Sequence, residues 1–363
     1  MARLEDVCEI LDSRRIPITA SDRIAGPYPY YGANGVQDYV ADYIFDDELI
    51  LLAEDGGNFG SKDKPIAYRV SGKCWVNNHA HVLKPKAGYD VNYVCYSLMY
   101  YDVSGLVNGA TRQKLTQADM RKMTIPERTL GEQQHIASIL GRIDGLISLR
   151  KQQLAKLDEL VKARFVELFG DGAEADNVAI EDVCKIITDG THQPPKFVQS
   201  GIPFLFVSNI VGNIITYDAE KFISEDTYAE LIKRTPIEIG DILLSTVGSY
   251  GHPAVVRSED RFLFQRHIAY LKPKRDLIDS TYFHGALLSE NVQRQIENHV
   301  KGIAQKTLNL SDIRTISFPL PSMDTQKAFA AFSQKVDESK LTIQQSLDKL
   351  EVLKKKLMQE YFG

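Results

Sequence analysis

The chain has 363 residues and a net charge of −5, with 44% hydrophobic and 25% charged residues. This composition excludes an intrinsically disordered chain, and no apolar run approaches the roughly 18 residues of a membrane-spanning helix. The mildly acidic balance disfavours a protein that binds nucleic acid through a general cationic surface.

The N-terminal residues contain no apolar signal core, so we expect a cytoplasmic protein. Its four cysteines, Cys8, Cys74, Cys95 and Cys184, form neither a CxxC pair nor a zinc-type cluster. We expect them to be small buried residues with reduced thiols, and we expect no metal site.

Residues 1–130 are predicted to form a first globular domain. After an opening segment over residues 3–12, the pattern predicts strands at 39–45, 48–52, 66–70, 73–76 and 123–126, and a helix at 91–101. Turns are expected at Asp55-Gly56-Gly57 and Ser71-Gly72, and loops at 28–34 and 109–114.

Residues 131–170 are predicted to form one long helix, about 60 Å in length at 1.5 Å per residue. Apolar residues recur at alternating spacings of four and three, which is the heptad pattern of a coiled coil. These positions are Ile136, Leu140, Ile143, Ile147, Leu154, Leu157, Val161 and Leu168, with Arg150 and Arg164 interrupting the series. The alternative is an ordinary amphipathic core helix.

Residues 171–321 repeat the plan of the first domain. Cys8 and Cys184 stand in matching Glu-Asp-Val-Cys segments, and His79 and His267 begin matching segments that end in Leu, Lys and Pro. Strands are predicted at 204–207, 241–245 and 254–256, and a helix at 280–297. The chain therefore reads as a tandem duplication.

Residues 322–363 are predicted to form a second long helix, displaced by 193 positions from the first. Its apolar positions are Phe329, Val336, Ile343, Leu347, Leu350 and Leu357, with Ser333, Lys340, Lys354 and Tyr361 completing the series. Both helices end in Phe-Gly. We expect an α+β protein in which the two helices pair as an antiparallel coiled coil with pseudo-two-fold symmetry, which would hold the two similar domains apart.

No catalytic motif is present in the sequence. Residues 56–62 are rich in glycine but lack P-loop spacing, and there is no GxGxxG, HExxH or GxSxG pattern. The His192-Gln193-Pro194-Pro195 segment lacks the flanking residues of a methyl-transfer site. We therefore expect a non-catalytic protein.

The predicted loops instead carry side chains suited to base edges and phosphates. In the first domain these are Arg14, Arg15, Tyr30, Tyr31, Asn34, Asn58, Lys62, Asn77, Asn78, Arg112, Gln113 and Lys114. In the second they are Thr191, His192, Gln193, Lys196, Asn209, Ser249, Tyr250, His252, Gln265, Arg266, Gln305 and Lys306. The alternatives are solvated loop positions, or core positions for the two tyrosines, His79 and His267.

Several of these segments together resemble a specificity (S) subunit of a type I restriction-modification system. They are residues 28–33, 54–56, 75–83 and 189–192, Ile125-Pro126 followed by Glu132-Gln133-Gln134, and the two Phe-Gly-ended helices. The resemblance covers essentially the whole chain. It implies target recognition domains at 1–130 and 171–321, with spacer helices at 131–170 and 322–363.

The resemblance also implies function and partners. Each recognition domain would read one half of a split, asymmetric double-stranded DNA site. Two methyltransferase subunits would dock on the helices, joined by restriction subunits that translocate DNA. S-adenosylmethionine, ATP and Mg²⁺ would be bound by those partners and none by this chain. The rival hypotheses are a stand-alone DNA-modifying enzyme with a divergent active site and a coiled-coil scaffold that binds only protein.

Overall fold

The computed structural model describes residues 1–61, 63–109, 112–170, 177–302 and 306–363. Lys62 and Gln305, both predicted DNA contacts, lie outside the described residues. The chain divides into unit 1, which comprises residues 1–151 and 345–363, and unit 2, which comprises residues 152–344. In the described ranges, no helix is long and apolar enough to cross a membrane. The four cysteines are free and buried.

Helices α4 (Leu130–Phe169) and α10 (Met323–Phe362) are the predicted long helices. Each contributes one half to unit 1 and the other half to unit 2, so the compact units cut across the four segments expected from the sequence. We call the globular part of unit 1 head 1 and that of unit 2 head 2.

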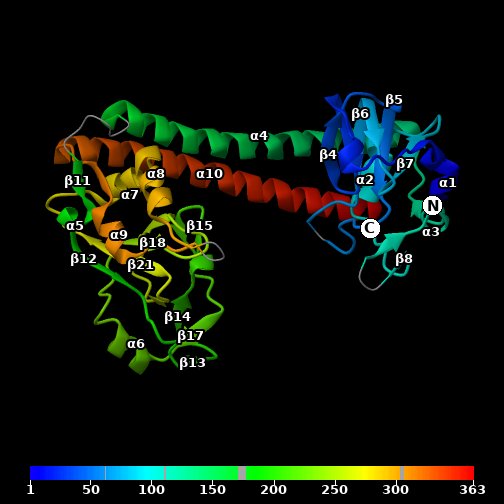
Figure 1. Cartoon of the computed structure of the whole chain (residues 1–363). Helices are drawn as coiled ribbons and strands as arrows, with labels where there is room; N and C mark the ends of the chain where they lie inside the picture. The colour runs from blue at the N-terminus through cyan, green and yellow to red at the C-terminus, as the bar shows by residue number, and fades with distance from the viewer. Residues whose placement is uncertain (62, 110–111, 171–176, 303–305) are drawn as a thin grey trace. The chain divides into compact units, whose positions relative to one another are not determined.

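Head 1 is built on a six-stranded sheet in the order β2-β7-β5-β6-β3-β4, with α2 (Val91–Met99) packed against β5 and β6 (Figure 1). The strands are β2 (Cys8–Ile10), β7 (Ala80–Pro85), β5 (Phe45–Ala53), β6 (Ala67–Val76), β3 (Ala25–Gly32) and β4 (Gly35–Val40). Smaller elements are β1 (Ala2–Arg3), α1 (Leu4–Val7), η1 (Asp12–Arg14), η2 (Ala20–Asp22), β8 (Val107–Asn108), β9 (Lys114–Leu115), α3 (Gln117–Met120) and β10 (Thr124–Ile125).

Three local predictions for head 1 were wrong. Residues 39–45 are not one strand, because β4 ends at Val40 and β5 begins at Phe45. Ser71 and Gly72 form no turn, since the β5–β6 ladder runs through them and pairs Gly72 with Asp47. The segment from Tyr28 to Gly32 is not a loop but part of β3, where it pairs with both β4 and β6.

Head 2 contains two four-stranded sheets, ordered β12-β21-β18-β19 and β13-β17-β14-β20. The first comprises β12 (Cys184–Asp189), β21 (Ile268–Pro273), β18 (Ile242–Ser245) and β19 (Pro253–Val255). The second comprises β13 (Phe197–Val198), β17 (Lys221–Ile223), β14 (Ile202–Leu205) and β20 (Leu263–Phe264). Other elements are β11 (Asn177–Ala179), α5 (Ile180–Val183), η3 (Val207–Asn209), β15 (Ile210–Val211), β16 (Ile214–Ile215), α6 (Glu225–Leu231), α7 (Ser280–Leu288), α8 (Glu290–His299), α9 (Leu310–Thr315) and β22 (Ser317–Pro319).

The helix predicted over 280–297 is in fact two helices. Ser289 ends α7 with an extended backbone (ψ 149°), and its side chain caps α8 by accepting from the Val292 N–H. A serine that caps the following helix satisfies that helix's first free N–H groups, which explains why the break falls at this residue.

The two heads share a three-stranded core. In head 1, β2 and β5 both pair antiparallel with β7, and in head 2, β12 and β18 both pair antiparallel with β21. The ladders place Leu83 opposite Ile10 and Ile50, and Leu271 opposite Ile187 and Ile242. This equivalence of register supports the predicted duplication and gives the residue correspondences used below.

Within each unit the two long helices run antiparallel. In unit 1, Asp144 pairs with Lys354 at 2.7 Å and Lys151 with Glu351 at 3.0 Å, so rising numbers in α4 meet falling numbers in α10. In unit 2, Lys340 pairs with Asp158 at 2.5 Å. None of the twenty heptad positions is exposed in either helix, as a paired coiled coil requires.

The Phe-Gly ends of both helices pack against a head. In unit 2, Phe169 lies 4.8 Å from the ring of Tyr282 in α7. In unit 1, Phe362 lies 5.3 Å from the ring of Tyr93 in α2, which brings the C-terminal residues into the same unit as the N-terminus (Figure 1). The repeated ending is therefore a contact with the core as well as a helix stop.

Candidate nucleic-acid interface

One edge of the shared three-stranded core brings together the polar loops of each head. Because β2 and β5 both run antiparallel to β7, they end at the edge where β7 begins. In head 1 this edge carries Asp12, Asp55 and His79, which follow β2, follow β5 and precede β7 respectively. The equivalent positions of head 2 are Asp189, Val247 and His267.

Head 1 has a cavity of about 400 Å³ at this edge. Most of its lining is polar, including Asn34, Gln37, Asn77, Asn78, His79 and Arg112. The side chains of Asn34 and Asn78 are exposed there, whereas Asn77 is 3% exposed and donates to Gln37. Amide and guanidinium groups of this kind match the hydrogen-bonding edges of bases.

Three residues at this cavity form the head 1 triad, which we define as Arg112, Asp55 and His79. Arg112 Nη2 donates to Asp55 Oδ1 at 2.5 Å, and His79 Nδ1 lies 2.7 Å from the same oxygen. The Asp55 side chain is 17% exposed, whereas that of Arg112 is 61% exposed. The carboxylate thus holds an arginine that remains accessible to a ligand.

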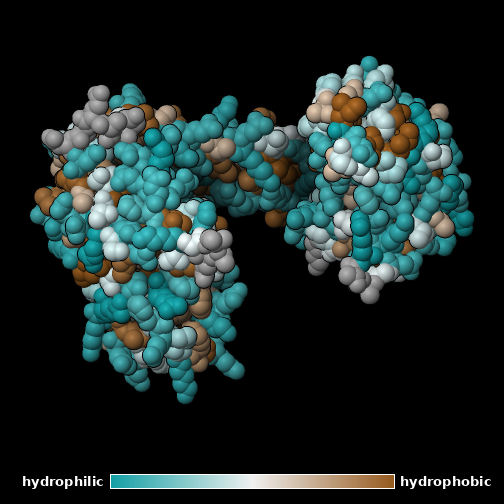
Figure 2. Space-filling view, in the orientation of Figure 1, coloured by the Kyte–Doolittle hydropathy of each residue, from teal (hydrophilic) through white to brown (hydrophobic). Residues whose placement is uncertain are grey.

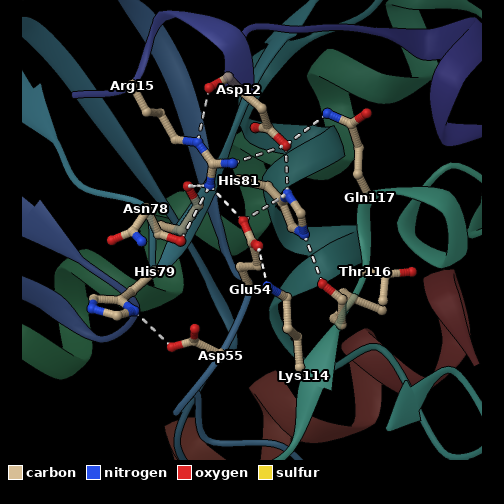
Figure 3. Close-up of polar contacts among 12 residues, drawn as sticks. Asp12, Arg15, Glu54, Asp55, Asn78, His79, His81, Lys114, Thr116 and Gln117 are labelled. Carbon is tan, nitrogen blue, oxygen red and sulfur yellow. Dashed lines mark hydrogen bonds and ion pairs between the residues drawn. The ribbon is translucent and has the colours of Figure 1, made fainter. Parts of the chain in front are cut away.

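Next to Asp55 and His79 lies a largely buried charged network centred on Arg15 (Figure 3). Arg15 donates to Glu54 Oε2 at 2.6 Å and to the Ala80 carbonyl at 2.8 Å. His81 Nδ1 lies 2.7 Å from Asp12 Oδ2, and Lys114 pairs with Glu54 at 2.9 Å. These contacts join the ends of β2 and β5 to the start of β7 and so fix the turn that carries Asn78 and His79.

The network also sets the ionisation of its two acids. Burial alone would raise the pKa of Asp12, but hydrogen bonds from His81, the Val82 N–H and Gln117 outweigh burial and lower it. Burial opposes ionisation of Glu54 as well, and Arg15 and Lys114 still hold its pKa below the usual value. Both side chains are therefore carboxylates at neutral pH.

Asp12, Glu54 and His81 are close enough to share a metal ion, since one ligand atom from each lies within 4.8 Å of the others. The carboxylate oxygens of Glu54 already accept from Arg15 and Lys114, and Asp12 accepts from Gln117. Two cations at the carboxylates fit an ion-pair network, and we assign no metal to it.

Head 2 has a cavity of about 610 Å³, lined in part by the loop that follows β12 and by the end of α6. Its polar lining includes His192, Gln193, Lys196, Lys233 and Arg234. Three residues here form the head 2 triad: Arg234, Asp189 and His192. Arg234 Nη2 donates to Asp189 Oδ1 at 2.6 Å, and His192 Nε2 lies 2.9 Å from Asp189 Oδ2.

The cavities gather only some of the residues predicted to contact DNA. Tyr30, Asn34, Asn77, Asn78 and Arg112 line the first, and Thr191, His192, Gln193 and Lys196 line the second. Other predicted residues line neither cavity: Arg14, Arg15, Tyr31, Asn58, Gln113, Lys114, Asn209, Ser249, Tyr250, His252, Gln265, Arg266 and Lys306.

Several of the predicted residues use their polar atoms inside the protein. Tyr30 is 1% exposed, and its hydroxyl bonds to the Ile18 backbone. Asn209 is 7% exposed and donates to the carbonyls of Thr216 and Asp218. The Arg15 side chain donates its hydrogen bonds to Glu54 and the Ala80 carbonyl in the buried network described above. These side chains support the loops and offer little surface to a ligand.

The residues predicted to contact DNA included neither Asp55 nor Arg234, and a core position was the alternative considered for His79. Arg234 follows α6, in a segment for which head 1 has no equivalent helix, so the internal repeat carried no signal for it. Asp55 was predicted only as part of a turn.

Known proteins of one family are similar to this chain over almost its whole length. A family model described as the type I restriction modification DNA specificity domain matches residues 1–159 and 173–354. A putative type I restriction enzyme specificity subunit of Haemophilus influenzae is 28% identical over 305 residues, which are 77% of this chain and 74% of the relative. The MjaVIII specificity subunit of Methanocaldococcus jannaschii is 22% identical, covering 99% of this chain and 90% of the relative.

Solved structures show the same fold. The type I restriction-modification S subunit from M. genitalium has a TM-score of 0.62 at 15% identity, covering 100% of this chain and 95% of that chain. A chain solved to explain complex assembly and conformational transition of the type I R-M system has a TM-score of 0.54 at 15% identity, covering 99% and 96%.

Proposed function

Because the chain belongs to the type I restriction-modification DNA specificity family, we propose that head 1 and head 2 each read one half of a split double-stranded DNA site. The chain itself carries out no chemistry in this proposal. Methyltransferase and restriction subunits assemble on it and supply catalysis, together with S-adenosylmethionine, ATP and Mg²⁺.

The observation that carries the proposal is the pair of polar cavities at the heads. Each contains an accessible arginine held by a carboxylate, together with at least one amide side chain that can bond to base edges. The sequences of the two cavities differ, so each head would prefer its own bases. Two different heads on one chain give an asymmetric site in two parts.

The long helices are the proposed docking surface for the partner subunits. Although their heptad positions face each other, other apolar side chains on them are exposed (Figure 2). In unit 1 these are Leu130, Leu146, Leu149, Val352 and Leu353, and in unit 2 they are Leu160, Val166 and Leu341. We propose that the partner subunits bind over these side chains.

A head exchange tests the proposal. Residues 177–319 are replaced by the equivalent head of another family member. The chimera is assembled with the methyltransferase subunit that partners the unmodified chain. Mapping of methylated bases should show one half-site changed and the other retained. If both halves change, or neither does, the heads are not independent readers.

The isolated chain serves as the control for catalysis. Incubated with DNA and labelled S-adenosylmethionine, it should transfer no methyl group, whereas the assembled complex should. Methyl transfer by the chain alone would assign the chemistry to this protein and contradict a non-catalytic role.

A further inference from the structure

The structure contains the same three-residue arrangement twice, at positions that are not equivalent in the duplication. Asp55 follows β5, and its counterpart in head 2 is Val247. Asp189 ends β12, and its counterpart in head 1 is Asp12, which lies in the buried network. Arg112 lies between β8 and β9, and Arg234 follows α6. The two triads are therefore not simply inherited copies of one ancestral site.

The triads nevertheless agree in detail. Each has an arginine whose side chain is more than half exposed, at 61% and 53%, and an aspartate whose side chain is nearly buried, at 17% and 15%. Each arginine uses Nη2 for the aspartate and lies 3.3–3.4 Å from the histidine. Among the described residues, neither Nη1 nor Nε of these arginines donates to a protein acceptor.

We propose that Arg112 and Arg234 each read a guanine, one in each half-site, and that Asp55 and Asp189 position them. This inference rests on the proposed function and names the residues that determine specificity. Guanine presents two acceptors, O6 and N7, in the major groove, and an arginine that keeps free N–H groups can donate to both. Because the aspartate already holds the planar guanidinium in one orientation, the side chain loses less conformational entropy when it binds the base, and binding is tighter.

The carboxylate behind each arginine argues against a phosphate contact. A phosphate that reached Arg112 would also approach the Asp55 carboxylate, whose oxygen lies 2.5 Å from Nη2. Like charges at that range repel, and the repulsion is strong where water is excluded. The edge of guanine is uncharged and carries no such penalty. The aspartates thus favour a base over the DNA backbone.

The first experiment uses the unmodified chain in its complex with the methyltransferase subunit. Each guanine of the recognised site is replaced, one at a time, by an analogue that lacks the N7 acceptor, and DNA binding is measured. One guanine in each half-site should be sensitive, with binding weakened about 10-fold or more.

The second experiment repeats these measurements on Arg112→Ala and Arg234→Ala. Each variant should lose preference at a single guanine, about 10- to 100-fold, and only in the half-site read by its own head. At that guanine the analogue should no longer weaken binding further, because the contact is already gone. Asp55→Asn and Asp189→Asn should reduce the preference for guanine at the same two positions by a smaller factor, as expected of positioning residues.

Each variant has a matched control in its own head. Arg69 pairs with Glu48 in head 1 and Arg261 with Glu225 in head 2, and neither residue lines either of the two cavities described above. Arg69→Ala and Arg261→Ala should leave base preference unchanged. These controls separate loss of a reading contact from loss of any exposed ion pair.

Two results would overturn the inference while leaving the proposed function standing. If Arg112→Ala weakens binding equally at all sequences and lowers the salt dependence by about one ion, Arg112 contacts phosphate. If the triad variants keep every base preference, other residues read the site. A complex of the unmodified chain with no sequence preference would instead contradict the proposed function itself.

Discussion

Head 1 and head 2 share a core, but they bury an acidic side chain at opposite ends of two equivalent strands, β5 in head 1 and β18 in head 2. In head 1, Glu54 follows β5 and joins the Arg15 network. The equivalent position in head 2 is Thr246, which is uncharged. Head 2 instead buries Asp241 completely, just before β18, where head 1 has the apolar Leu49.

Glu54 and Asp241 each accept hydrogen bonds or ion pairs from at least two donors. Asp241 accepts from the Tyr270 hydroxyl at 2.6 Å, Arg275 at 3.2 Å and Lys272 at 3.4 Å. The comparison indicates that the fold is determined by its apolar ladder and tolerates a charge at either end, provided that the partners come with it. A buried charge costs most when it is left without a partner. The predictions below use equivalent positions to test this reading.

The largest effect is expected from Glu54→Ala. The substitution leaves Arg15, whose side chain is 13% exposed, with only Asp12 at 3.6 Å as a carboxylate partner, and should lower the free energy of unfolding of unit 1 by up to about 3–5 kcal/mol. Thr246→Ala at the equivalent position should cost about 1 kcal/mol or less. Denaturant unfolding, followed by hydrogen exchange in each unit, measures both. Similar losses in the two variants would contradict a charged network specific to head 1.

Acid should destabilise the two heads in different pH ranges. Burial, with a smaller effect from Arg257, lowers the pKa of His284 in head 2 to about 4 from 6.5. Because the unfolded histidine binds a proton that the folded one does not, stability falls as pH drops from about 6.5 to about 4, by up to about 3 kcal/mol. Burial and then Arg266 also lower the pKa of His267. Asp90 and Asp279 cap the equivalent helices α2 and α7, which makes Cys95 the head 1 equivalent of His284. Burial raises the pKa of the Cys95 thiol to about 12, so the thiol stays neutral.

The carboxylates of head 1 act at lower pH. The pKa values of Asp12 and Glu54 are lowered, so their contribution is complete above about pH 4.5 and is lost as pH falls through the folded-state values. Hydrogen exchange between pH 6.5 and 4.5 should therefore show unit 2 opening before unit 1. His284→Gln should remove most of that difference, whereas equal loss in both units would show that His284 is not responsible.

Much of this architecture could be predicted from the sequence because it depends on periodicity. The heptad positions follow from repeated apolar spacing, and the duplication follows from matching segments and from the two long helices, which keep the same spacing. The strand β3 could not be predicted, because Pro27 and Pro29 are typical of turns. Pro27 falls within the register shift between Ala25 and Tyr28, whereas Pro29 pairs with Tyr39.

The candidate sites were harder to predict than the fold. A polar residue in a loop looks the same in sequence whether it supports the loop, as Arg15 does, or lines a cavity, as Arg112 does. The difference lies in partners that are distant in the chain: Arg15 meets Glu54, and Arg112 meets Asp55. Arg15 follows β2, which pairs with β7 beside β5, and Arg112 lies just before Lys114, which forms a bridge with Asp55. Periodicity says nothing about such contacts between loop ends.

The smallest effect is expected where equivalent residues of the two long helices meet their heads. Asp144 accepts from the buried Tyr96 hydroxyl at 2.8 Å and also pairs with Lys354. Its equivalent, Asp337, forms an exposed ion pair with Arg257 at 3.2 Å. Asp144→Ala should cost about 1–2 kcal/mol because a buried hydroxyl loses its acceptor, while Asp337→Ala should cost less than about 0.5 kcal/mol. Urea midpoints of the two variants measure the difference. Since salt screens only the exposed pair appreciably, the Asp144 effect should persist in high salt, and its loss there would show that the Tyr96 contact contributes little.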